Sequence, residues 1–222
     1  MPPDASDEEL LAAFQQGDAG AFERLLHRHR GPLFTFLLRM LGDRERAEDL
    51  AQEAFLRVVK GAGAWREKAK FKTWLYAIAR NLCVDQSRRD KFRRADSLDA
   101  VGEGADGDDG QPLGERVASP DAGPERASTS AQLKPLLVAA LRALPEEQRE
   151  VFVLREQAGL AFKEIAELVG INENTVKSRM RYALEGLRKH LELAGVTAAV
   201  AVEIESDALP GAQAAGMVKA RA

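Results

Sequence analysis

The sequence of 222 residues has few of the features that mark secreted or membrane-spanning proteins. It has a single cysteine, Cys83, so it cannot form an internal disulfide, and a reducing compartment is the natural setting. No apolar run approaches the roughly 20 residues that a membrane-spanning helix needs. The N-terminus is acidic and shows no signal-peptide pattern. These absences predict a soluble, cytoplasmic protein that is not inserted in a membrane.

Patterns typical of enzymes and cofactor sites are missing as well. The sequence has no glycine-rich phosphate loop and no nucleophile motif. His27 and His29 are close in sequence, but their i, i+2 spacing points them to different sides of a helix. Without Cys or acidic partners at ligand spacing they are poor metal ligands. We therefore expect no enzymatic activity, no metal and no other cofactor.

The charge of the chain is small in total, but it is sorted along the sequence. The net charge is only −3, which at first argues against binding to nucleic acid. Residues 60–94 nevertheless carry eleven bases and three acids, a net charge of +8, whereas residues 96–130 carry nine acids and two arginines. Residues 1–20 hold five acids and no base. This distribution indicates a modular protein with one surface that faces phosphates.

Strand signals are scarce, and the helical periodicity predicts an all-α protein of two small helical domains joined by a flexible acidic linker. The expected parts are an acidic N-terminal segment at 1–20, helical domains at 21–95 and 131–193, a disordered linker at 96–130, and a low-complexity tail at 194–222. The linker is assigned because its Gly, Asp, Pro and Ser content buries too little apolar surface to offset the entropy of ordering.

Helix boundaries within these domains follow from breaks and caps. Gly17-Asp18 and Gly42-Asp43 predict breaks in the first domain, and Thr73 is a good N-cap for a later helix. In the second domain, Pro145 suits a helix N-terminus. The single cysteine, Cys83, lies in an apolar helical stretch and is expected to be a core thiol.

Residues 162–179 predict a helix-turn-helix. Gly170 supplies the tight turn, Ala166 is small where the two helices approach, and Asn172 suits the N-cap of the second helix. The exposed side of that second helix is basic, and a short basic helix fits the major groove of DNA. The chain is therefore expected to bind DNA.

Two further segments make this prediction specific. Residues 49–56, followed by residues 71–81, resemble region 2 of bacterial RNA polymerase sigma factors. The Leu144-Pro145 start and the helix-turn-helix resemble their region 4. Because only a linker separates the two, the layout is similar to the extracytoplasmic-function (ECF) group of the sigma-70 family. The resemblance implies an alternative sigma factor that binds core RNA polymerase, recognises the −35 and −10 promoter elements and helps to open the DNA for a specialised regulon.

The resemblance also assigns roles to individual residues. The residues expected to contact the clamp helices of the largest polymerase subunit are Asp49, Gln52, Glu53 and Leu56. Those expected at the −10 element, where the loop at 65–71 would hold a flipped base, are Lys68, Lys70, Phe71, Lys72, Arg80, Asn81, Asp85, Arg88 and Arg89. Those expected at the −35 element are Thr175, Lys177, Ser178, Arg179, Arg181 and Tyr182. Trp74 and Tyr76 fit either a stacking platform or the core, and for Trp74 the core is preferred.

Alternatives remain open at this point. A free-standing DNA-binding regulator of the LuxR type has a similar helix-turn-helix. That hypothesis leaves residues 49–56 and the basic residues 60–94, the basic block, unexplained. The resemblance also implies an anti-sigma factor as a further partner, with nothing in the sequence to identify it. The acidic linker would cross the polymerase cleft, either as a mimic of nucleic acid or as a solvated spacer.

Overall fold

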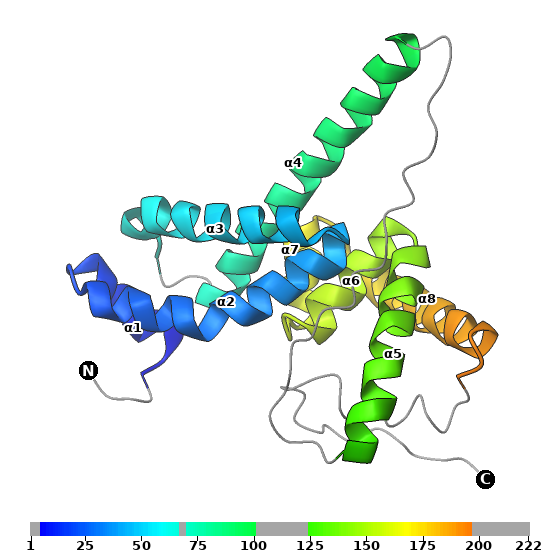
Figure 1. Cartoon of the computed structure of the whole chain (residues 1–222). Coiled ribbons are helices and arrows are strands. Elements are labelled where there is room, and N and C mark those ends of the chain that lie inside the picture. The colour runs from blue at the N-terminus through cyan, green and yellow to red at the C-terminus, as the bar shows by residue number, and fades with distance from the viewer. Residues whose placement is uncertain (1–4, 67–69, 101–123, 197–222) are drawn as a thin grey trace. The chain divides into compact units, whose positions relative to one another are not determined.

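The structure, a computed structural model, describes residues 5–66, 70–100 and 124–196, which form helices and no strand (Figure 1). The chain divides into two compact units, Met1–Ala127 and Ser128–Ala222. The predicted all-α class is confirmed. No helix within the described residues is both long and apolar enough to cross a membrane.

Within its described residues, the first unit is built from α-helices and a short 3₁₀ helix. They are α1 (Asp7–Gln15), α2 (Ala19–Leu41), α3 (Arg44–Gly61), η1 (Ala62–Ala64) and α4 (Phe71–Ala100). The break before α2 is set by Asp18, whose carboxylate accepts from the Ala21 N–H. The break before α3 is set by Gly42, in the left-handed region at φ 72°, and by Asp43, which caps the Arg46 N–H. Both predicted breaks are confirmed.

The core of the first unit forms where α2 packs against α1, α3 and α4. Its largest fully buried side chains are Leu10, Leu11, Leu25, Leu33, Phe36, Leu37, Phe71, Leu75 and Tyr76. Cys83 is also buried, as predicted. At the periphery, Arg46 of α3 donates to Asp90 of α4 at 2.7 Å and ties the two helices together.

The second unit contains α5 (Pro124–Ala143), α6 (Glu146–Glu156), α7 (Phe162–Val169) and α8 (Glu173–Leu193). Helix α8 packs on α6 and α7, and it buries one continuous side. The buried residues of that side are Val176, Met180, Ala183, Leu187 and Leu191. Gly186 lies so close to Leu144 that a Cβ there would come within 2.6 Å of the leucine Cδ2. The spacing of the buried residues, three or four apart, explains why the opposite side of α8 faces solvent.

One predicted helix start is wrong. Helix α4 begins at Phe71, so Thr73 lies inside its first turn and is not the N-cap. Helix α4 extends to Ala100 and α5 begins at Pro124, so both helices reach into the segment predicted as linker. The remainder of that linker, residues 101–123, lies outside the described residues, as do the tail from Thr197 onward and the first four residues.

Candidate functional site

The four residues expected to bind polymerase lie together on the solvent side of α3. Their i, i+3, i+4 and i+7 spacing places Asp49, Gln52, Glu53 and Leu56 along one stripe. Leu56 is 52% exposed and is among the large apolar side chains that face solvent. Glu53 accepts from Arg57 at 2.9 Å, and this hydrogen bond holds the pKa of the Glu53 carboxyl below its usual range. The stripe therefore combines ionised and amide acceptors with an exposed apolar side chain.

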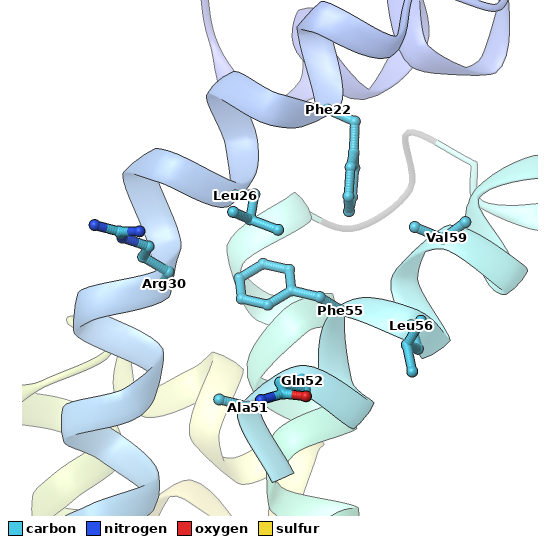
Figure 2. Close-up of a pocket in the computed structure, with 8 residues that line it drawn as sticks. All are labelled: Phe22, Leu26, Arg30, Ala51, Gln52, Phe55, Leu56 and Val59. Carbon is cyan, nitrogen blue, oxygen red and sulfur yellow. The ribbon is translucent and has the colours of Figure 1, made fainter. Parts of the chain in front are cut away.

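An apolar groove runs beside this stripe, between α2 and α3 (Figure 2). It has a volume of about 430 Å³ and is lined by Phe22, Leu26, Arg30, Ala51, Gln52, Phe55, Leu56 and Val59. The ring of Phe55 meets that of Phe22 edge-on at 6.5 Å and forms the floor between the two helices. Leu56 and Gln52 belong to both the stripe and the groove, so the two features form one surface. We call this surface the α3 face.

The residues expected at the −10 element fall into separate groups. Asn81, Asp85, Arg88 and Arg89 are all exposed, and their spacing places them on one stripe of α4. Lys72 is half-buried and lies about 180° around the helix from Asn81, since successive residues turn by about 100°. Lys70 is exposed just before α4, and Arg80 is half-buried. Lys68 lies outside the described residues.

The prediction that Phe71 contacts DNA is wrong for its side chain. Phe71 is fully buried, and its ring packs 5.3 Å from that of His29 and 6.2 Å from that of Trp74. Tyr76 is also fully buried, and Trp74 is half-buried against Gly61. The aromatic residues at the start of α4 therefore hold the helix onto the core, and Tyr76, for which the sequence left two interpretations open, is a core residue.

The turn between α7 and α8 has the predicted helix-turn-helix geometry. Gly170 adopts φ 79°, and its N–H donates to the Ala166 carbonyl at 2.9 Å. The Asn172 side chain then caps α8 by accepting from the Thr175 N–H at 2.7 Å. The Thr175 hydroxyl donates to the same oxygen at 2.9 Å, so Thr175 belongs to the cap.

The exposed side of α8 presents most of the residues expected at the −35 element. Lys177, Ser178, Arg181 and Tyr182 are exposed on two adjacent turns. Arg181 lies over the Tyr182 ring at 4.9 Å. Arg179 differs from these four, because its side chain is only 21% exposed and donates to Glu147 in the first turn of α6. Arg179 thus contributes to the packing of α8 on α6.

The bases of α8 have acidic partners in the free protein. Lys177 pairs with Glu173 at 2.6 Å, Arg181 with Glu185 at 3.9 Å, and Arg188 with Glu192 at 2.8 Å. These pairs are local to the helix, and a count of cations alone does not reveal them. They lower the positive potential of the side that faces solvent.

No three His, Cys, Asp or Glu side chains within the described part of the chain are placed to hold a metal ion. The organised features are therefore the α3 face, the α4 stripe and the exposed side of α8. All three are surfaces of helices in the described part of the chain.

Comparison with known proteins identifies the family. The family model for sigma-70 region 2 matches residues 25–93, and that for sigma-70 region 4 matches residues 135–187. The chain is 34% identical over 184 residues to the ECF RNA polymerase sigma factor SigW of Bacillus subtilis, covering 83% of this chain and 96% of SigW. The chain belongs to the sigma-70 family, in its ECF group.

Other relatives of this sigma factor agree. It is 31% identical to the RNA polymerase sigma-H factor of Pseudomonas aeruginosa, over 84% of this chain and 94% of that protein. Its fold is shared by the sigma factor RpoE of Bartonella quintana, solved in complex with the anti-sigma factor NepR. The TM-score is 0.57 and the sequence identity 22%, over 77% of this chain and 96% of RpoE. The fold is also shared by CnrH, solved in complex with the cytosolic domain of CnrY. The TM-score is 0.60 and the sequence identity 20%, over 85% of this chain and 99% of CnrH.

This protein is therefore an alternative sigma factor for transcription initiation. The match to region 2 accounts for residues 49–56 and for the basic block, which the LuxR-type alternative left unexplained. That alternative has no support from these comparisons.

Proposed function

We propose that the α3 face is the surface through which this sigma factor binds core RNA polymerase, on the clamp helices of the largest subunit. The observation that carries the proposal is the exposed Leu56, which lies at the edge of the apolar groove among the polar side chains of Asp49 and Gln52. An apolar centre with a polar rim is the usual anatomy of a protein interface.

The α4 stripe is proposed to engage the −10 element. Asn81 offers an amide that can pair with a base edge, and Arg88 and Arg89 offer charges to phosphates. Lys70 stands at the start of α4, next to the segment expected to hold the flipped base. Phe71 is left out of this interface because it is buried.

The exposed side of α8 is proposed to read the −35 element in the major groove. Lys177, Ser178 and Arg181 are the base-reading candidates, and Tyr182 adds an exposed ring beside them. Each good base contact discriminates against a wrong base by about 1–3 kcal/mol. Arg179 is assigned to positioning α8, because it is bound to Glu147.

The chain itself is proposed to perform no chemistry and to act in the cytoplasm, where polymerase forms RNA. An anti-sigma protein is a further proposed partner, by analogy with the complexes of RpoE and CnrH. Such a protein would silence the factor by covering the α3 face, since it would then exclude polymerase.

Run-off transcription with core polymerase and a library of promoter DNA tests the proposal. Start sites that depend on this protein and share −35 and −10 elements are expected. Leu56→Asp should weaken binding to core polymerase by about tenfold or more, as loss of a central contact does. Arg44→Ala, on another side of α3 and paired with Glu48, is the matched control and should bind normally. DNA binding without any initiation would contradict the proposal.

A further inference from the structure

Helix α1 contacts both ends of the segment that links η1 to α4. The Gln15 side-chain amide donates to the Ala62 carbonyl at 2.7 Å and to the Trp65 carbonyl at 3.3 Å. The Glu8 carboxylate accepts from the backbone N–H of Phe71 at 2.9 Å. Glu8 and Gln15 are seven positions apart, so they lie on the same side of α1, about two turns from each other. One face of α1 therefore holds the backbone at Trp65 and at Phe71.

The contact at Phe71 acts as a helix cap from another element. The first turn of α4 contains no acidic residue, and the Trp74 N–H donates to the Lys70 carbonyl at 3.1 Å. A carboxylate at a helix N-terminus satisfies an unpaired N–H and complements the helix dipole. Glu8, 63 positions away in the sequence, supplies both the hydrogen-bond acceptor and the negative charge. The start of α4 is consequently fixed by tertiary structure.

Helix α1 is itself firmly anchored on α2. Leu10 and Leu11 are fully buried, and Asp7 accepts from both Arg28 and His29. Burial alone would raise the pKa of Asp7, but the hydrogen bonds and charges of His29 and Arg28 outweigh it and hold the pKa below its usual range. The α1 contacts to Trp65 and Phe71 thus come from a helix whose own position is determined.

We propose that Glu8 and Gln15 are positioning residues for the −10 element: they fix Trp65 and Phe71 before DNA arrives and so preorganise the promoter-binding surface at the start of α4. The inference rests on the proposed assignment of this region to the −10 element. Preorganised binding surfaces gain affinity because less ordering remains to be done on binding. Neither residue needs to touch DNA.

The test uses holoenzyme assembled from core polymerase and the full chain. The probe is a fluorescent single-stranded oligonucleotide that carries the non-template −10 sequence defined by run-off transcription, together with versions substituted at single bases. Fluorescence anisotropy gives the dissociation constants and the discrimination ratio between bases. A −35 duplex and core polymerase are titrated in parallel.

The expected result is a loss confined to the −10 probe. Glu8→Ala should weaken binding to that probe by about threefold to tenfold, the change that loss of one helix cap corresponds to. Gln15→Ala should reduce base discrimination in the same direction. Glu8→Gln keeps an acceptor oxygen and should recover most of the affinity. Binding to the −35 duplex and to core polymerase should remain within about twofold for all three variants, because Glu8 and Gln15 lie outside both proposed surfaces.

Glu9→Ala is the matched control. Glu9 closes the capping box of α1 by accepting from the Ser6 N–H at 2.7 Å, and it is exposed. If Glu9→Ala weakens −10 binding as much as Glu8→Ala does, the effect reflects the stability of α1 and the inference is wrong. It is also wrong if Glu8→Ala binds and discriminates like the unchanged protein. A holoenzyme of the unchanged protein that ignores the −10 sequence would instead refute the proposed function itself.

Discussion

Tyr76 offers a sharp test of how the first unit is packed, because its ring is well packed while its hydroxyl is unsatisfied. The residue is fully buried, and its ring meets Phe36 edge-on at 5.1 Å. Its hydroxyl has no hydrogen-bond partner among the residues that the structure describes. A buried polar group left without a partner costs about 1–3 kcal/mol of stability.

Tyr76→Phe keeps the ring contact and removes the unsatisfied oxygen. We expect it to raise the free energy of unfolding by about 1 kcal/mol. Tyr76→Ala removes the ring as well and should lower the free energy of unfolding by about 3–5 kcal/mol. For a unit of this size, a change of 1 kcal/mol corresponds to a shift in Tm of about 4–8 °C. The two variants should therefore move the transition in opposite directions.

Urea unfolding followed by tryptophan fluorescence measures this effect selectively. Both tryptophans of the chain, Trp65 and Trp74, lie in the first unit, so the signal reports the unfolding of that unit. Burial also raises the pKa of the Tyr76 hydroxyl above its ordinary value of 10.0. The folded protein therefore holds the Tyr76 proton more tightly than the unfolded chain does, and the free energy of unfolding falls as pH rises above 10.0. Tyr76→Phe should lack this alkaline loss.

A clear loss of stability in Tyr76→Phe would refute the reasoning, because it would show that the hydroxyl is satisfied. Tyr182→Phe is the matched control. Tyr182 lies in the second unit and is 47% exposed. Its substitution should leave the fluorescence transition of the first unit unchanged.

Three further predictions concern α1, the turn and α8. Asp7→Asn should lower the unfolding free energy of the first unit by about 1–3 kcal/mol at neutral pH. Because the pKa of Asp7 is lowered, the difference should vanish as pH falls through it, and equal stability at neutral pH would contradict this. Gly170→Ala forces a side chain into φ 79° and should destabilise the second unit by about 1–2 kcal/mol in a thermal melt monitored by circular dichroism. Glu173→Gln frees Lys177 and should raise the affinity of the full chain for non-specific duplex DNA by about twofold to fivefold at low salt, with the gain disappearing at high salt.

The features that the sequence predicts correctly depend on groups a few residues apart. Gly42-Asp43 ends one helix and starts the next, and Asn172 caps α8 through a residue three positions later. The stripe of Asp49, Gln52 and Leu56 follows from helical periodicity alone. Such signals act within one or two turns, so they are visible without knowledge of the fold.

The errors arise where distant segments decide the outcome. Thr73 is a good capping residue, but α4 starts at Phe71, whose N–H donates to Glu8 of another helix. Phe71 lies between Lys70 and Lys72 in a basic segment, and its burial depends on packing against His29 of α2. The pairing of Arg179 with Glu147, which are 32 positions apart, likewise follows from how α8 packs on α6. No local pattern encodes these contacts.

The acidic partners on α8 have a consequence for how the protein searches a genome. Binding to DNA usually releases small cations from phosphates, and each neutralised phosphate steepens the salt dependence of affinity. If α8 contacts DNA as proposed, Lys177, Arg181 and Arg188 would first have to exchange a glutamate for a phosphate, which would reduce the net attraction to arbitrary DNA. A bacterial chromosome offers on the order of 10⁶ competing sites or more. If the chain binds those non-specific sites weakly, more of it remains free to bind polymerase before it binds DNA.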